Sequence, residues 1–392
     1  MSIKESDKTY LAATYKRFDV CITGGNGSVV YDENGKEYID LGGGIAVNTF
    51  GIADKEWINA VTHQLNQVQH TSNLYYSVPN VMLAEMLCNR TGMKKVFFSN
   101  SGAEANECAI KAARKYSADK YGDNRYTIIT LKNSFHGRTV TTLAATGQDK
   151  FHTDFQPLTP GFAYVEPGDL EAVKEICKSG SVAAIMIEVV QGEGGVLPLE
   201  YDFVKKLYEF TSQNDILLIC DEVQCGNGRT GKLFGYMNYD ITPDIVTTAK
   251  GLGGGLPLGA TLLGERVKDT FTPGSHGSTF GGNPVCCAGA INILSRLNEK
   301  VLDGVKRKSE FIINTLKNAK GIKGITGMGL MLGIETEGDA GEIINECISK
   351  GILPIAAKNK VRLLPALNIP DDLLKKAVNV IKNVCEVYAN ES

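Results

Sequence analysis

The chain has 392 residues with 41 basic and 44 acidic side chains, and its 43% hydrophobic and 22% charged residues are ordinary for a globular protein, which excludes disordered, coiled-coil and collagen-like chains. The formal net charge of −3 gives no electrostatic reason to expect binding to nucleic acid or to an anionic membrane. Because no stretch approaches the ~20 apolar residues that cross a bilayer, and residues 1–10 lack the apolar core of a secretory signal, we expect a cytoplasmic protein with neither kind of partner.

The first predicted element is a hairpin over residues 29–41, with its turn at Asn34-Gly35. From about residue 55, short apolar runs alternate with helical periodicity. Strands are predicted at 96–98, 127–131, 182–190, 216–220 and 245–248, and helices at 103–120, 169–179 and 201–213. This alternation predicts an α/β fold, in which helices cover both faces of a mostly parallel sheet.

The pattern changes again near residue 285. A long helix is predicted over 284–320 and a strand over 325–335, followed by a helix at 340–351, a strand at 361–364 and a last helix at 371–388. A chain of this length has room for two domains. We therefore expect a smaller α+β domain after the large one.

Acidic residues end two of the buried strands. Asp221 follows the apolar run 216–220, and Glu188 stands at the end of another such run. Ligands of open α/β sheets bind beyond the carboxyl ends of the strands. Either acid could equally be a solvated residue of a polar loop.

Lys250 follows a strand and precedes the glycine-rich sequence GLGGG. A desolvated lysine has a lowered pKa and can form a Schiff base with a carbonyl, although an ordinary surface lysine fits the same pattern. The segment 99–107, SNSGAEANE, opens a helix with good N-cap residues, and a helix N-terminus can bind phosphate. An anion site, an amine and a carboxylate at one edge of a sheet are what pyridoxal 5'-phosphate requires.

Several motifs resemble those of the class III pyridoxal-phosphate-dependent aminotransferases, in the same order and over nearly the whole chain. They are NSGAEANE (100–107), FHGRT (135–139), VVQGEGG (189–195), DEVQCGNGRTG (221–231), AKGLGGGLPLGA (249–260) and STFGGNP (278–284). Within that class, GGGIAVN (42–48), SNLYY (72–76) and RLLPALNI (362–369) are similar to the acetylornithine aminotransferase group. The resemblance implies the fold type I of these enzymes, with residues 1–55 joining the small domain, 56–284 forming the large cofactor-binding domain and 285–392 the C-terminal small domain.

The resemblance also implies roles for single residues. Lys250 would hold the cofactor as a Schiff base and move protons, while Asp221 would pair with the pyridine nitrogen. Thr279 would reach the phosphate of the partner subunit in a homodimer. Further cofactor contacts are implied for Ser101, Gly102, Ala103, Phe135, His136, Val223 and Gln224. His136 is expected to be a neutral, packed residue, because Lys250 already supplies the base.

Four residues would bind substrate by the same resemblance: Arg138, Glu193, Ser278 and Arg362. Arg138 would take the distal carboxylate of either substrate, and Arg362 the second carboxylate of glutamate. Glu193 would neutralise Arg362 when acetylornithine is bound. Gly44, where ornithine δ-aminotransferases carry a tyrosine, would leave room for an acylated amine.

The implied reaction is transamination of N2-acetyl-L-ornithine with 2-oxoglutarate in arginine biosynthesis. Related activities on succinylornithine, ornithine or 4-aminobutyrate remain open, as does, more distantly, a non-catalytic binding protein on the same fold. A dinucleotide-binding dehydrogenase is disfavoured, because neither GLGGG nor GMGLMLG has the GxGxxG spacing. The 10 cysteines form no CxxC pair and no histidine has the spacing of a metal ligand, so we expect reduced thiols and no metal.

Overall fold

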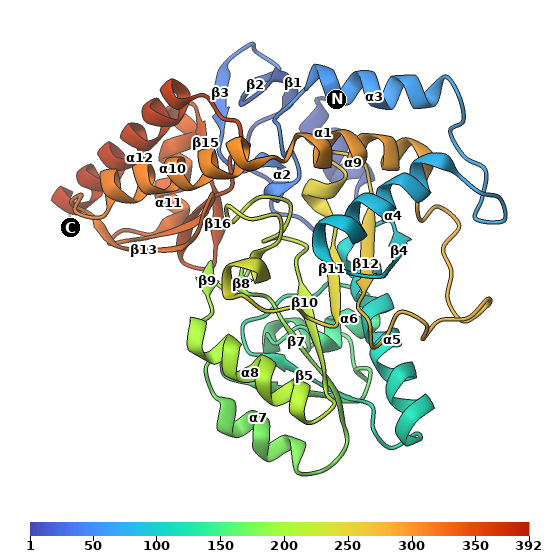
Figure 1. The fold of residues 1–392 in the computed structure, drawn as a ribbon. Coiled ribbons are helices and arrows are strands. Elements are labelled where there is room, and N and C mark those ends of the chain that lie inside the picture. Colours follow the sequence, from blue (N-terminus) through green and yellow to red (C-terminus); the bar gives the residue numbers. More distant parts are fainter. Residues whose placement is uncertain (392) are drawn as a thin grey trace.

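The computed structural model describes residues 1–391 and is built around a seven-stranded sheet (Figure 1). In spatial order its strands are β4 (Lys95–Ser99), β12 (Gly259–Leu263), β11 (Ile245–Thr248), β10 (Leu217–Asp221), β7 (Val182–Ile187), β5 (Thr127–Leu131) and β6 (Phe162–Val165). Strand β12 is antiparallel to both of its neighbours, and the ladders from β11 to β6 are parallel. The α/β prediction is therefore confirmed.

Both faces of this sheet are covered, which explains why its strands are continuous apolar runs. Ile219 in β10 belongs to a buried cluster with the alanines of α5 (Gly102–Tyr121). Its neighbour Leu218 points to the opposite face, in the cluster that includes Leu207 of α8 (Tyr201–Gln213). The two-residue periodicity of the strand thus divides the core between two layers of helices.

The remaining strands form two four-stranded sheets. One contains β1 (Ile22–Asn26), β2 (Val29–Asp32), β3 (Glu37–Asp40) and β15 (Ile352–Leu353); the other contains β13 (Ile322–Met328), β14 (Met331–Thr336), β17 (Lys360–Leu363) and β16 (Ile355–Ala357). The predicted hairpin is present, with Gly35 at φ 78° in its turn. Strand β3 also pairs in parallel with β15, placing Ile39 opposite Ile352. An early segment and a late segment of the chain therefore share one sheet.

The rest of the secondary structure is helical or consists of short pieces. The α-helices are α1 (Ile3–Tyr10), α2 (Gly43–Ala46), α3 (Lys55–Leu65), α4 (Val78–Thr91), α6 (Val140–Ala145), α7 (Leu170–Cys177), α9 (Pro284–Arg296), α10 (Glu299–Leu316), α11 (Ala340–Ser349) and α12 (Asp371–Glu391). The short pieces are β8 (Val190–Gln191), β9 (Leu197–Pro198) and the 3-10 turns η1 (Asp149–Phe151), η2 (Gly235–Tyr239) and η3 (Lys250–Leu252). Among residues 1–391, no helix is long and apolar enough to cross a membrane.

Most predicted elements shift by one to three residues at their ends, and three of the predictions need a fuller correction. The helix predicted over 284–320 is two helices, because Leu297 leaves the helical conformation and Asn298 caps α10 by accepting a hydrogen bond from Val301 N. The strand predicted over 325–335 is the second half of β13, a tight turn and β14, since Gly329 reverses the chain at φ 59°. The strand predicted over 182–190 ends at Ile187.

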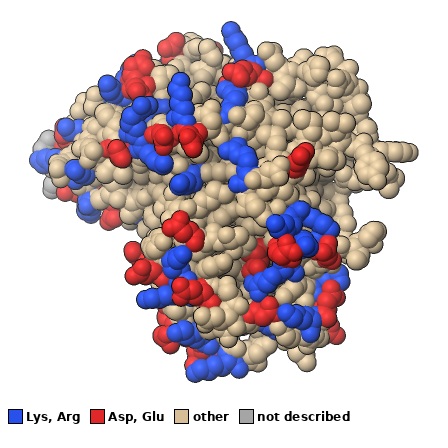
Figure 2. All heavy atoms as spheres, viewed as in Figure 1, with Lys and Arg blue, Asp and Glu red and all other residues tan. Residues whose placement is uncertain are grey.

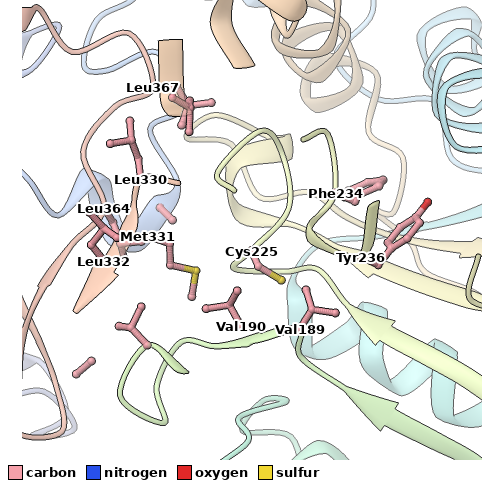
Figure 3. Packing of buried hydrophobic residues seen from close by; sticks show 14 of the residues in the cluster. Val189, Val190, Cys225, Phe234, Tyr236, Leu330, Met331, Leu332, Leu364 and Leu367 are labelled. Atoms are coloured by element: carbon pink, nitrogen blue, oxygen red, sulfur yellow. The ribbon is translucent and has the colours of Figure 1, made fainter. Parts of the chain in front are cut away.

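A hydrophobic core continues from the large sheet into the C-terminal region (Figure 3). Val190 and Cys225 follow strands of the large sheet, whereas Leu330, Met331 and Leu332 come from the turn and strand after β13. All five side chains are buried. This packing holds the loops after β7 and β10 against the smaller sheets, where the candidate site lies.

Candidate active site

A cavity of about 490 Å³ lies beyond the carboxyl ends of β5, β7, β10 and β11, where the N-terminus of α5 meets them. Its lining includes Val47, Asn100, Ser101, Gly102, Ala103, Asn106, Phe135, His136, Gly137, Arg138, Glu188, Asp221, Val223, Gln224, Ala249, Lys250 and residues 255–258. All of the predicted cofactor-binding residues except Thr279 are in this set. The position agrees with the general place of ligands in open α/β sheets.

Asp221 is the last residue of β10 and is 3% exposed. Its Oδ2 accepts hydrogen bonds from Asn106 Nδ2 and His136 Nδ1, both at 2.8 Å, and its Oδ1 accepts one from Val223 N at 3.0 Å. Asn106 is itself fixed, because its Oδ1 accepts a bond from Thr247 Oγ1 at 2.6 Å. The carboxylate is therefore held in a buried site by donors from α5, from the loop after β5 and from the loop after β10.

His136 serves this arrangement as an orienting group. Its ring is buried, Nδ1 is directed at Asp221, and Nε2 has no hydrogen-bond partner among the described residues. Its main-chain N donates to Thr146 Oγ1 at 2.9 Å, and its carbonyl accepts from Asn106 Nδ2 at 2.7 Å. A packed ring that donates to a carboxylate is placed to polarise Asp221 rather than to act on substrate.

Lys250 begins η3, two residues after β11 ends, with φ 47°. Asn227 Nδ2 donates to the carbonyl of Ala249 at 3.1 Å, and Thr49 Oγ1 donates to the carbonyl of Gly251 at 2.8 Å, so the backbone is fixed on both sides. Across residues 1–391 the amine makes no hydrogen bond or ion pair, and burial lowers its pKa. Such an amine is suited to react with a carbonyl.

The N-terminus of α5 provides an anion site at the other side of the cavity. Ser101 caps the helix, its Oγ accepting from Glu104 N at 3.2 Å. The N–H groups of Gly102 and Ala103 precede the first intrahelical bond and are free to bind an anion. A Cβ added at Gly102 would lie 2.6 Å from Val223 Cγ1, so a larger residue would displace the loop after β10.

A partly buried ion pair lies beside the cavity and is joined to it through Gln224. Arg362, 3% exposed in β17, donates from Nη1 to Glu193 Oε1 at 2.7 Å and to Gln224 Oε1 at 2.9 Å. Burial alone would raise the pKa of Glu193, but Arg362 holds it below its usual value. The Nε of Arg362 is buried without a partner among the described residues, so the guanidinium keeps a donor for a further acceptor.

Glu188 ties two loops of the cavity together. Its Oε1 accepts from Phe135 N at 2.7 Å and its Oε2 from Gly192 N at 3.3 Å. Burial raises the pKa of this carboxyl to about 7. The acid that the sequence places at a strand end thus orients the chain at Phe135 and next to Glu193.

Four predicted site residues are not among those that line this cavity, namely Glu193, Ser278, Thr279 and Arg362. Glu193 and Arg362 are connected to it through Gln224, which lines it. Ser278 and Thr279 lie near one another in a loop beside residues 70–73, where Asn73 Nδ2 donates to the carbonyl of Ser278 at 3.0 Å. Ser278 Oγ also accepts from Asn100 Nδ2 at 3.2 Å, which places it close to the cavity's edge. Gly44 lines a second cavity, between residues 15–22 and 353–355, rather than the first.

The residues present fit pyridoxal 5'-phosphate. The cavity holds an unpaired buried amine, a fixed carboxylate and a helix N-terminus with free N–H groups, and Phe135 supplies an aromatic ring. These are the groups that an aldehyde, a pyridinium nitrogen, a phosphate and a planar ring require. No cluster of three or more His, Cys, Asp or Glu side chains able to hold a metal occurs in the described part of the chain.

Sequence reasoning missed Asn106, which has no motif of its own for this role. The available signal was a polar residue on the apolar stripe of α5, between Ala105 and Cys108. It also missed that the glycine-rich segment after Lys250 lines the cavity, with residues 255–258 closing one side.

Comparisons with known proteins match one family model and many relatives. The family Aminotransferase class-III matches residues 10–385. An acetylornithine aminotransferase of Haemophilus ducreyi is 48% identical over 97% of this chain and 98% of its own length, and one of Caldanaerobacter subterraneus subsp. tengcongensis is 45% identical over 96% and 98%.

Solved structures that are similar to this chain are also aminotransferases. The ornithine aminotransferase of Toxoplasma gondii superposes with a TM-score of 0.94 at 30% identity, covering 99% of this chain and 94% of that one, and its structure was described with partial occupancy of PLP at the active site. The N-acetylornithine aminotransferase of Stenotrophomonas maltophilia K279a has a TM-score of 0.86 at 34% identity, covering 99% and 100%.

Proposed function

Because the chain belongs to the aminotransferase class-III family, whose cofactor is pyridoxal 5'-phosphate, we propose that it transfers the δ-amino group of N2-acetyl-L-ornithine to 2-oxoglutarate. The products are N-acetyl-L-glutamate 5-semialdehyde and L-glutamate, and the reaction is a step of arginine biosynthesis. The relatives from Haemophilus ducreyi and Caldanaerobacter subterraneus are named acetylornithine aminotransferases, and their similarity to this chain extends over almost its full length.

The Arg362–Glu193 ion pair is the observation that carries the choice of substrates. Glutamate has a carboxylate on the reacting carbon, and Arg362 is the cation that binds it. The reacting carbon of acetylornithine has none, so Glu193 then neutralises Arg362. Arg138, on the other side of the cavity, takes the distal carboxylate of both substrates.

Each residue of the site has a proposed chemical task. When bound, the cofactor supplies an electron sink for the negative charge left on a carbon that has lost its proton. Asp221 keeps the ring nitrogen of the cofactor protonated, and its carboxylate is held for this by His136 and Asn106. Lys250, whose amine has a lowered pKa, would take the proton from the amine-bearing carbon of the substrate and would deliver it to the carbon at the other end of the C–N bond.

The contacts with the cofactor are proposed in the same way. Gly102 and Ala103 hold the phosphate through their main-chain N–H groups, with Ser101 beside them. Phe135 stacks on the ring of the cofactor. Val223 and Gln224, in the loop after β10, complete its surroundings.

A panel assay tests the substrate assignment. Acetylornithine, succinylornithine, ornithine and 4-aminobutyrate are compared as amine donors to 2-oxoglutarate, with release of glutamate as the signal. We expect acetylornithine to give the highest kcat/KM. A higher value for any of the other three donors would replace the assignment with that activity, and no turnover with any donor would favour a binding protein.

We also propose that two chains form a homodimer and that Thr279 completes the phosphate site of the partner. Tyr75 and Tyr76 are largely exposed, and Phe280, next to Thr279, is 61% exposed. The surface over α3, α4 and α9 carries few charged side chains, whereas charges gather elsewhere on the visible face (Figure 2). An exposed apolar patch of this kind is typical of a protein interface.

The domain division and the location of the protein remain proposals. The pairing of β3 with β15 supports joining residues 1–55 to a small domain of residues 285–392, with 56–284 as the large domain. A biosynthetic reaction on free amino acids supports a cytoplasmic location.

A further inference from the structure

Arg138 is an exposed guanidinium without a fixed acidic partner. Within residues 1–391 its side chain makes no ion pair or hydrogen bond, although it lines the cavity. Its Cζ lies 4.5 Å from the centroid of the Phe151 ring and 5.7 Å from that of Phe135. The aromatic rings are therefore the only groups seen to orient it in the described structure.

The backbone at this point is fixed independently of the rings. Thr139 caps α6, and its Oγ1 donates to Glu107 Oε1 at 2.5 Å. Gly137 precedes Arg138 at φ 143°, and a Cβ there would lie 2.4 Å from Thr142 Oγ1. These contacts hold the Cα of Arg138 in place but leave its long side chain free to rotate.

Phe151 is itself held in place at the end of η1. Its main-chain N donates to the carbonyl of Gln148 at 3.0 Å, and Gln148 Nε2 donates to the carbonyl of Ser134 at 3.0 Å. The ring meets Phe135 edge-on, with centroids 5.9 Å apart and an interplanar angle of 69°. Phe151 thus joins the arginine to the segment that carries the ring-stacking residue.

We propose that Phe151 is a positioning residue for substrate recognition, whose ring holds Arg138 in the orientation that binds the distal carboxylate. The inference deepens the proposed function and rests on its assignment of Arg138. A guanidinium offers its face to an aromatic ring while its N–H donors, which lie in the plane, stay free for a carboxylate. The contact also removes rotational freedom that binding would otherwise have to remove.

The test compares Phe151→Leu, which removes the ring, with Phe151→Tyr, which keeps it. The substrates are N2-acetyl-L-ornithine and N-acetyl-1,4-diaminobutane, the same amine without the carboxylate. We expect Phe151→Leu to raise KM for acetylornithine roughly three- to thirtyfold, the range of a cation–π contact. The kcat of acetylornithine and the kcat/KM of the carboxylate-free amine should stay unchanged, and Phe151→Tyr should restore the KM.

A second measurement is independent of turnover. Glutarate, a dicarboxylate that carries no amine to react, is titrated calorimetrically into the cofactor-loaded protein, and Phe151→Leu should weaken its binding by a similar factor. Lys150→Ala is the matched control, because Lys150 Nζ lies 4.8 Å from the same ring centroid without contacting substrate in this scheme. We expect this variant to behave as the wild type.

Three results would overturn the inference: equal losses for the two amines, a Tyr variant as impaired as the Leu variant, or unchanged glutarate binding in Phe151→Leu. Failure of the proposed function looks different, because the wild type would then prefer another donor in the panel. The positioning role of Phe151 would then be tested with that donor, provided that the donor carries a distal carboxylate.

Discussion

Arg362 and Glu193 lie 169 positions apart in the chain and form an ion pair of 2.7 Å at the edge of the candidate site. Arg362 comes from β17 and Glu193 from the turn between β8 and β9, so the pair spans the two parts of the molecule. Because Gln224 accepts a second bond from the same nitrogen of Arg362, the arginine can exchange one acceptor without losing both.

Replacing the two arginines should separate the half-reactions. Arg362→Ala should lower kcat/KM for glutamate roughly 30-fold or more, the cost of losing a buried ion-paired contact, and affect acetylornithine much less. Arg138→Ala should weaken both halves. Single-turnover absorbance changes with each amine measure this, and equal damage to both halves by Arg362→Ala would contradict the exchange of partners.

Glu193→Gln should have the opposite effect to Arg362→Ala, with the larger loss for acetylornithine. The amide cannot neutralise Arg362, so we expect the KM for acetylornithine to rise while that for glutamate is unchanged or falls. The same single-turnover measurement applies. A loss confined to glutamate would mean that Glu193 has a different role.

Asp221→Asn should retain cofactor but reduce kcat by roughly a hundredfold or more, because a neutral amide no longer stabilises a protonated ring nitrogen. The visible absorbance of the purified variant reports whether cofactor is present, and its melting temperature whether the fold is intact. A wild-type rate in a cofactor-loaded Asp221→Asn would assign the carboxylate another task.

Mixing the inactive Lys250→Ala variant with the impaired Thr279→Ala variant tests the proposed role of Thr279 across subunits. In a mixed dimer of Lys250→Ala and Thr279→Ala chains, one site would combine an intact Lys250 with the intact Thr279 of the other chain. Unfolding and refolding the mixture should therefore raise activity above that of either variant alone. If Thr279 acts within its own chain, no mixture exceeds the Thr279→Ala homodimer.

Glu222 should impose a pH dependence on stability. It is fully buried and accepts hydrogen bonds from Gly235 N and Tyr236 N, both at 2.7 Å, and burial raises its pKa from 4.5 to about 7. Between these values the folded protein binds the proton and the unfolded chain does not, so this group's contribution to stability falls as pH rises.

The measurement is the melting temperature of the wild type and of Glu222→Gln at pH 5 and pH 8. The variant lacks the ionisation, so the advantage of the wild type should be larger at pH 5. An advantage that grows toward pH 8 would show that the two main-chain N–H groups stabilise the charged form more than burial disfavours it.

The large sheet was predictable because its strands are buried on both faces. The strand predicted at 127–131, the strand at 245–248 and the helix at 201–213 are confirmed with unchanged bounds. The break at Leu297 was missed because no glycine or proline marks it and the apolar periodicity continues through α10, although Asn298 is an N-cap residue that signals a new helix. Local pattern records burial, but it does not show that α9 packs against α3 and α4 whereas α10 packs against α12 and β13.

Prediction of the site shows the same division. Residues in motifs, such as Asp221 and Lys250, line one cavity, because both stand at the carboxyl ends of neighbouring parallel strands. Asn106 and Phe151 could not be found in this way, because their contacts depend on neighbours 115 residues away in one case and on ring orientation in the other. The motifs identify the residues that react, whereas the residues that orient them are found only from their contacts in the folded protein.

The parallel pairing of β3 with β15 also constrains how the protein is made. Lys36, between β2 and β3, donates from Nζ to the carbonyl of Ser349, 313 residues later. On the ribosome the amino-terminal hairpin emerges first, and β3 can pair with β2 at once, but its other edge stays unpaired until β15 is made. Such a nascent edge is exposed to self-association for most of synthesis, so truncated products that stop before residue 352 should aggregate or require chaperones.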